Sequence, residues 1–173
     1  MSYRLFHISE QPGIKLFEPR PSPSAFEQIT GDVVFAITEQ LLHNYLLPRD
    51  CPRVTCYLSA KTKPEDKARF FENTVADYII VVESRWYKQI ANTTLYCYEF
   101  DPANFTLLDE CAGYYVSYKP VEPISETTIT ALIPELLKRK LELRFMPSII
   151  EFSKTVSKST LNFSLIRMRN AQT

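Results

Sequence analysis

The chain has 173 residues, of which 45% are apolar and 13% aromatic, so its composition excludes an intrinsically disordered protein. This length is enough to bury a substantial core, and we expect a single domain over residues 1–173. Twenty lysines and arginines are balanced by twenty aspartates and glutamates, and the zero net charge argues against a general nucleic-acid or membrane-surface binder.

Features that the sequence lacks narrow the function further. Only three glycines are present, without a P-loop or a dinucleotide-binding fingerprint, so any phosphate must be held by arginines or helix N-termini. The first residues show no signal-peptide pattern, and no run approaches the ~20 apolar residues that span a bilayer, so we expect a cytoplasmic protein without a membrane anchor. Four cysteines without a C-x-x-C pair, and only two histidines, argue against a metal site and for reduced thiols.

The first part of the chain is predicted to combine short strands with stiff loops. In chain order, the pattern predicts a strand over residues 3–8, a strand over 33–37, a helix that Thr38 caps and Pro48 ends, a strand over 54–58 and a helix over 61–73. The loop over residues 9–32 is long, and its segment 18–23 holds three prolines that should keep Arg20 at a defined place. A second stiff loop, Pro-Arg-Asp-Cys-Pro-Arg, covers residues 48–53.

The second part mixes strands and helices without regular alternation. In chain order, the pattern predicts a strand over residues 78–83, helical turns over 84–91, strands over 93–100, 105–109 and 113–118, a helix over 127–140 that is interrupted or restarted at Pro134, a helix over 147–157 and a strand over 161–168. Residues 141–145 fit either a helix or a strand. We therefore expect an α+β protein with mixed, largely antiparallel sheets and short helices.

His7 and three arginines are the first candidates for a site. His7 ends the first strand beside Ser9, either as a satisfied, partly buried side chain or as an imidazole that contacts a ligand. Arg20, Arg49 and Arg53 lie in proline-stiffened segments, where a guanidinium is suited to bidentate binding of a carboxylate or phosphate. Alternatively, these arginines pair with nearby acidic residues and hold the loops together.

A thiol and three carboxylates are further candidates. Cys51 lies between Asp50 and Pro52, and nearby arginines that lower the pKa of its thiol would make it a nucleophile, but the sequence shows no base beside it. Glu83, Glu99 and Glu110 lie at strand ends, where a catalytic carboxylate or a merely solvated one is expected.

Three short motifs resemble those of the ADP-ribosyltransferase fold, in its poly-ADP-ribose-polymerase-like branch. His7-Ile8-Ser9 resembles the His-x-Ser that ends the first strand of that family. Val33-Val34-Phe35-Ala36 and Asn44-Tyr45 resemble its Ile-Tyr-Phe-Ala strand and the following helix that ends in Asn-Tyr. Residues 114–118, Tyr-Tyr-Val-Ser-Tyr, resemble its strand Tyr-Ile-Val-Tyr.

This resemblance implies NAD as a possible cofactor, with His7 and Ser9 on the ribose and amide of its nicotinamide half. Phe35 and Tyr45 stand at family-like positions. The chain departs from the family at two places, because Val34 replaces the tyrosine that stacks on nicotinamide, and the position of the catalytic glutamate falls on Gly113 or Tyr114.

The chain also resembles an uncharacterised bacterial family marked by F-H-I-S-E, F-E-P-R-P and P-R-D-C-P-R. All three motifs are present, at residues 6–10, 17–21 and 48–53, and this second resemblance spans nearly the whole chain.

Two functions follow as hypotheses. In the first, the protein is an enzyme for NAD- or ADP-ribose-type nucleotides, with His7, Glu99 and Glu110 as catalytic candidates. Its substrate-binding candidates are Ser9, Arg20, Phe35, Tyr45, Arg49 and Arg53. In the second, the protein is a non-catalytic module that holds a small anionic ligand or a protein partner near His7, Arg20 and Arg49.

Overall fold

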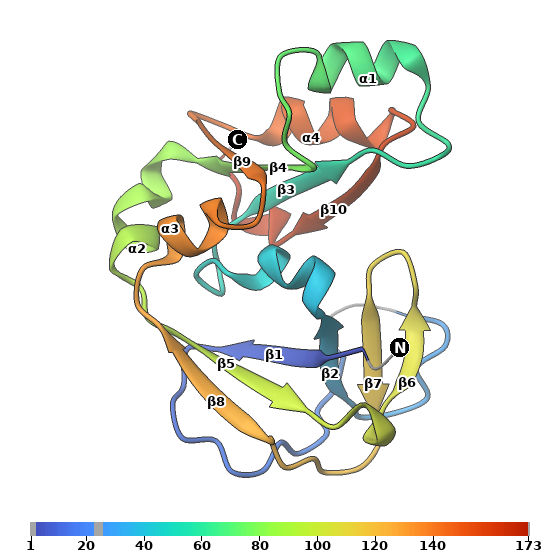
Figure 1. Cartoon of the computed structure of the whole chain (residues 1–173), viewed down its shortest axis with the longest axis vertical. Coiled ribbons are helices and arrows are strands. Elements are labelled where there is room, and N and C mark those ends of the chain that lie inside the picture. The colour runs from blue at the N-terminus through green and yellow to red at the C-terminus, as the bar shows by residue number, and fades with distance from the viewer. Residues whose placement is uncertain (1–2, 23–25, 173) are drawn as a thin grey trace. The chain divides into compact units, whose positions relative to one another are not determined.

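The computed structural model describes residues 3–22 and 26–172 and divides the chain into two compact units (Figure 1). Unit 1 consists of Met1–Tyr45 and Thr94–Thr130, and unit 2 of Leu46–Thr93 and Ala131–Thr173. Each unit contains its own β-sheet. The two mostly antiparallel sheets and the short helices confirm the predicted α+β class, whereas the single domain over residues 1–173 stays a prediction.

Within the described part of unit 1, six strands form one antiparallel sheet in the spatial order β6-β7-β2-β1-β5-β8. They are β1 (Leu5–Ser9), β2 (Val34–Thr38), β5 (Leu95–Phe100), β6 (Thr106–Asp109), β7 (Tyr114–Ser117) and β8 (Ser125–Ile129). The 3₁₀ helix η1 (Glu39–Tyr45) follows β2 directly, and η3 (Pro102–Asn104) joins β5 to β6. Thr38, which was predicted to cap the following helix, is the last residue of β2.

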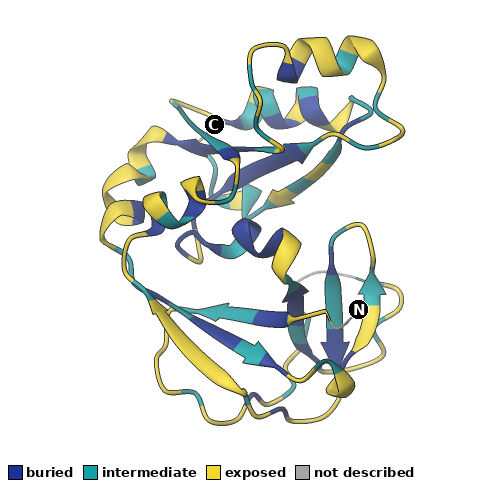
Figure 2. Ribbon diagram, in the orientation of Figure 1, coloured by how far each residue is buried: buried dark blue, intermediate teal, exposed yellow. Residues whose placement is uncertain are grey.

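One face of this sheet, the core face, carries the apolar core of unit 1. Leu5 of β1 and Val34 of β2 lie in this core with Tyr98 and Phe100 of β5, and the two aromatic side chains are fully buried. Because side chains alternate between the faces of a strand, Phe35 projects from the opposite face. At the edge of the sheet, β8 is almost entirely exposed (Figure 2).

The long loop after β1 crosses the core face as an anchored arm. Phe17 exchanges two backbone hydrogen bonds with Val121 (2.8 and 3.0 Å), and Arg20 exchanges two with Val33 (3.0 and 2.9 Å). The Phe17 side chain is buried in the core. The arm is therefore ordered, as expected, up to residue 22, and Pro23, which the sequence also assigned to it, lies outside the described residues.

Within the described part of unit 2, four strands form a sheet in the order β10-β3-β4-β9. They are β3 (Arg53–Tyr57), β4 (Tyr78–Glu83), β9 (Leu141–Met146) and β10 (Asn162–Ile166). The pair β4–β9 is parallel and the other pairs are antiparallel. The helices are α1 (Pro64–Phe71), η2 (Ser84–Trp86), α2 (Tyr87–Asn92), α3 (Leu132–Leu137), α4 (Ile150–Ser157) and η4 (Met168–Asn170).

Helices α1 and α4 cover one face of this sheet. Phe70 and Phe71 of α1 are buried with Val156 of α4 against Val54 and Val81 in the central strands. Pro64 begins α1, where a proline is favoured because the missing N–H would have no helical acceptor. The predicted helix with its two inward phenylalanines is confirmed, but it spans Pro64–Phe71 instead of residues 61–73.

The helix predicted over residues 127–140 is wrong in its first half. Residues 125–129 form β8, which pairs with β5 from Leu95↔Ile129 to Glu99↔Ser125, and α3 begins only at Leu132. Thr127, Thr128 and Ile129 are β-branched, and such side chains fit a strand better than a helix. Pro134 lies in the first turn of α3, where it interrupts nothing.

Residues 141–145, which the sequence left open between helix and strand, belong to β9 and pair in parallel with β4. Among the helices of the described residues, none combines the length and the apolar character that crossing a membrane requires.

Candidate functional site

Three of the motifs singled out in the sequence come together in the sheet of unit 1. The motif with His7 lies on β1, the motif with Phe35 on β2 and the motif with Tyr114 on β7, and these strands are neighbours in the order β7-β2-β1. The register pairs Phe35 with Val116 and Ile37 with both Phe6 and Tyr114. By strand alternation, His7 projects from the core face and Phe35 and Tyr114 from the opposite face.

His7 links β1 to β2 inside an aromatic environment. Its Nδ1 lies 2.9 Å from the carbonyl oxygen of Phe35, and because a carbonyl only accepts, Nδ1 carries the proton. The imidazole ring lies 5.0 Å from the ring of Phe17 and 6.4 Å from that of Phe100, between centroids. The neighbouring Ser9 hydroxyl accepts a hydrogen bond from the backbone N–H of Gln11 (3.0 Å). These contacts indicate a structural role for the side chains of His7 and Ser9.

On the opposite face, four partly buried aromatic residues form what we term the ring cluster: Phe26, Phe35, Tyr45 and Tyr114. Centroid separations between its contacting rings are 6.1–6.3 Å. The Tyr45 hydroxyl donates to the Tyr114 hydroxyl at 2.7 Å. The cluster therefore offers aromatic edges and faces together with two polar hydroxyls, and groups of this kind bind a planar, partly polar ring.

Sequence reasoning found only half of the ring cluster. Phe35 and Tyr45 were predicted from the motifs. Tyr114 was noted as part of the strand motif over residues 114–118 and as a possible position of the missing glutamate, but not as a site residue, although a tyrosine at the start of a strand after a glycine turn could have suggested a second hydroxyl. Phe26 lies in a loop without periodicity, so no local signal identifies it.

The predicted catalytic carboxylates are engaged in ion pairs with other residues or are exposed. Glu99 forms a bidentate ion pair with Arg4, at 2.8 Å from Nε to Oε1 and 2.9 Å from Nη2 to Oε2. The hydrogen bonds from Arg4 lower the pKa of the Glu99 carboxyl below its usual value, which favours the ionised form. Glu110 lies in the exposed turn between β6 and β7. Glu83, in unit 2, is fully buried and pairs with Arg85 at 2.7 Å.

The three predicted arginines occupy different environments. Arg20 is exposed in unit 1 and pairs through its backbone with Val33 at the start of β2. Arg49 and Arg53 belong to unit 2, where Arg49 is exposed and Arg53 is 2% exposed. Nη1 of Arg53 donates to the carbonyl oxygens of Cys51 (2.8 Å) and Pro48 (3.3 Å), so this arginine braces its own loop.

The expectation that arginines activate Cys51 is wrong. The thiol is fully buried, and burial raises its pKa to about 12, an effect that the nearby positive charge of Arg53 opposes but does not overcome. The Cys51 thiol donates weakly to the carbonyl oxygen of Pro52 at 3.6 Å. A neutral, enclosed thiol is a packing group rather than a nucleophile.

We therefore expect Cys51 to resist alkylation in the folded protein. With a pKa of about 12, only about one thiol in ten thousand is ionised near pH 8. Treatment with iodoacetamide followed by peptide mass spectrometry should label the exposed Cys111 first and Cys51 only after denaturation. Labelling of Cys51 at the rate of Cys111 in the folded protein would restore it as a nucleophile candidate.

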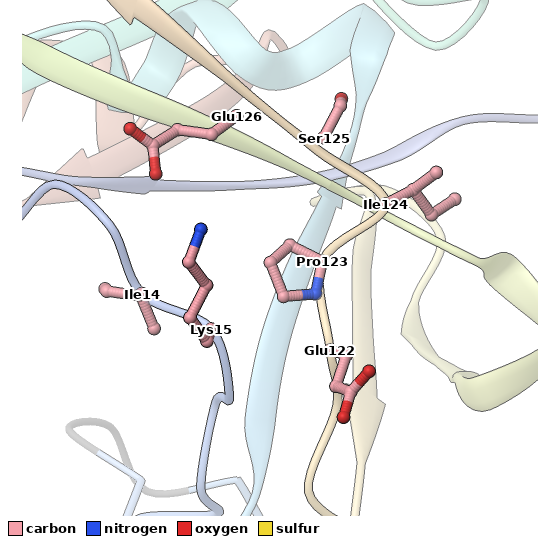
Figure 3. Close-up of a pocket in the computed structure, with 7 residues that line it drawn as sticks. All are labelled: Ile14, Lys15, Glu122, Pro123, Ile124, Ser125 and Glu126. Carbon is pink, nitrogen blue, oxygen red and sulfur yellow. The ribbon is translucent and has the colours of Figure 1, made fainter.

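A polar pocket of about 400 Å³ opens between the arm and the start of β8 in unit 1 (Figure 3). It is lined by Ile14, Lys15, Glu122, Pro123, Ile124, Ser125 and Glu126. The carboxylate of Glu126 accepts a hydrogen bond from the backbone N–H of Gly13 at 2.9 Å, which ties the arm to β8. None of the site residues predicted from the sequence lines this pocket.

The fold and these contacts define an α+β protein with an aromatic cluster on one sheet and a buried arginine brace beside the other. The model of a protein family of unknown function, DUF6886, matches residues 6–171, and the chain belongs to this family. The expected membership of an uncharacterised family is thereby confirmed. No curated protein and no solved structure matches the chain.

Proposed function

We propose that the protein handles an NAD- or ADP-ribose-type nucleotide, with the ring cluster of unit 1 receiving the planar ring of the ligand. The observation that carries this proposal is the adjacency of β7, β2 and β1. The three motifs that resemble the ADP-ribosyltransferase fold are separated by up to about a hundred residues in the chain, and a chance resemblance gives no reason for them to occupy neighbouring strands.

The ring cluster supplies what a nicotinamide or adenine ring needs. The phenylalanine rings offer apolar contact area, and the linked hydroxyls of Tyr45 and Tyr114 can donate to and accept from an amide or a ring nitrogen. Arg20, exposed on the arm where its backbone bridges to Val33 just before β2, is the guanidinium that would neutralise a phosphate. In an enzyme, the break of the glycosidic bond develops oxocarbenium-like positive charge, which a carboxylate such as Glu99 or Glu110 would stabilise.

A non-catalytic binding module is the second candidate, and the position of the missing glutamate favours it. Gly113 has a φ of +66°, and a Cβ added there would lie 2.6 Å from the Thr38 hydroxyl oxygen. A side chain of any kind is therefore disfavoured at this position. At the alternative position, Tyr114 already bonds Tyr45. Glu99, meanwhile, is committed to Arg4.

Binding and turnover should be measured with NAD, ADP-ribose and nicotinamide, by calorimetry and by release of nicotinamide from NAD. We expect saturable binding that Tyr45→Phe or Tyr114→Phe weakens by about fivefold to tenfold, because each removes one hydroxyl worth about 1 kcal/mol. Tyr78→Phe is the matched control, since Tyr78 also belongs to a tyrosine pair, with Tyr57 at 5.2 Å in unit 2.

The outcomes separate the two candidates. Turnover of NAD that falls in Glu99→Gln or Glu110→Gln supports the enzyme, and binding without turnover supports the module. If none of the three compounds binds, or if Tyr78→Phe weakens binding as much as Tyr45→Phe, the proposal is overturned for both.

A further inference from the structure

A second polar cluster lies in unit 2, at one end of its sheet. The register places the first residue of β3, Arg53, beside the last residues of β10 and β4, so the segments that leave these strands meet at the same edge. These segments are the loop over residues 48–53, residues 83–85 from the last residue of β4 onward, and residues 167–172 after β10. We call the last of these the terminal segment.

Four hydrogen bonds tie the terminal segment to the other two segments. Arg167 Nε donates to the carbonyl oxygen of Arg49 (3.2 Å), and Asn170 Nδ2 donates to that of Asp50 (2.8 Å). Arg85 Nη2 donates to the carbonyl oxygen of Asn170 (2.5 Å). The backbone N–H of Gln172 donates to Glu83 Oε1 (2.6 Å). The terminal segment is thus bound to both of the other segments.

The three segments concentrate positive charge in a chain whose net charge is zero. They contain five arginines and two carboxylates, and the arginines are Arg49, Arg53, Arg85, Arg167 and Arg169. One of the carboxylates, Glu83, is fully buried and already accepts from Arg85 and Gln172. Positive charge therefore exceeds negative charge at this edge, where an anion would be attracted.

Arg85 and Arg167 are held in the way that anion recognition requires. Each has part of its guanidinium bonded to the protein, which leaves further N–H groups, and the Arg85 side chain is 47% exposed. A guanidinium that is already oriented loses less conformational freedom when it binds a ligand. Arg167 also has a φ of +54°, in the left-handed region that non-glycine residues adopt rarely and at a cost, and such backbone conformations gather at functional sites.

We propose that Arg85 and Arg167, together with the exposed Arg169 of the same terminal segment as Arg167, form a binding site in unit 2 for a phosphoryl group of a small ligand. The planar guanidinium forks match phosphate oxygens, and a dianion or diphosphate balances the excess of positive charge better than a single carboxylate does. All of these contacts lie within unit 2, so the site does not depend on the ring cluster of unit 1.

The test is isothermal titration calorimetry at low ionic strength with inorganic phosphate, with pyrophosphate and with ADP-ribose. We expect saturable binding of pyrophosphate that Arg167→Gln and Arg169→Gln each weaken about tenfold, as the loss of a charge-assisted hydrogen bond predicts. Arg167→Lys keeps the charge without the fork and should weaken binding by an intermediate factor. Arg69→Gln, at an exposed arginine of α1, is the matched control and should leave binding unchanged. Thermal unfolding of each variant checks that it is folded.

The affinities for the three ligands show which kind of molecule supplies the phosphoryl group. Tighter binding of ADP-ribose than of pyrophosphate indicates a nucleotide, whereas equal affinities indicate that the phosphates alone are recognised. Absence of saturation up to ~10 mM pyrophosphate, or equal weakening by Arg69→Gln, would overturn the site. Tyr45→Phe should leave pyrophosphate binding unchanged, so failure of this site and failure of the ring cluster are distinguishable.

Discussion

Replacement of Arg53 by methionine should lower the free energy of unfolding of unit 2 by about 3 kcal/mol. Methionine keeps much of the apolar stem, but it removes the donor to the buried carbonyl oxygen of Cys51, whereas the Pro48 oxygen keeps the hydrogen bond from the Cys51 N–H (3.0 Å). Leaving a buried acceptor without a donor costs more free energy than a typical hydrogen bond contributes to stability, because the unfolded chain would form that bond with water. The cost falls on the loop from which β3 starts, and so on the sheet of unit 2.

Urea unfolding followed by tryptophan fluorescence measures this effect, because Trp86 is the only tryptophan and belongs to unit 2. Lys67→Met, on the exposed side of α1, is the control, and a surface change of this kind should alter stability by less than about 0.5 kcal/mol. Equal stabilities of the Arg53 and Lys67 variants would show that the buried guanidinium does not brace the loop.

Replacement of Gly113 by alanine should destabilise unit 1 by about 2–4 kcal/mol, whereas Gly13→Ala should cost only about 1 kcal/mol. Both glycines have positive φ, of +66° and +70°, so the backbone penalty of a Cβ is similar. They differ in the space around them, because a Cβ at 113 meets the Thr38 hydroxyl oxygen at 2.6 Å and a Leu41 methyl group at 3.1 Å, whereas a Cβ at 13 meets nothing within 4 Å.

The neighbours of Gly113 have little freedom to withdraw. The backbone N–H of Thr38 donates to the Gly113 carbonyl oxygen (3.1 Å), which pins the two backbones together, and Thr38 is β-branched. Differential scanning calorimetry of the wild type and the two alanine variants measures the difference. Equal losses in both variants would mean that the turn between β6 and β7 moves away from η1 at little cost.

The Gly113 result also bears on function. If the alanine variant is strongly destabilised, a glutamate at this position is incompatible with the turn, and the non-catalytic candidate gains support. If alanine is well tolerated, Gly113→Glu can be made. NAD turnover by that variant would then favour the enzyme candidate.

Much of the secondary structure follows from local patterns in the sequence. The apolar run at residues 78–83 coincides with β4, and the proline and acidic residues that open α1 mark its start. These signals are local because they depend on the period of side chains along one element. The side-chain periodicity did not predict the strand at residues 127–129. These β-branched residues lie at an exposed sheet edge and show little apolar alternation, and their pairing with β5 is a long-range contact.

The candidate site depends on contacts that no local pattern contains. Tyr45 and Tyr114 are 69 residues apart, and only the pairing of β2 with β7 and the placement of η1 bring their hydroxyls together. The hypothesis of a reactive thiol at Cys51 arose because the sequence shows the neighbouring charges without the burial that outweighs them. Composition, strand period and turn residues therefore determined the α+β class, whereas tertiary packing decided which polar groups meet, since desolvation and long-range pairing exist only once the sheets have formed.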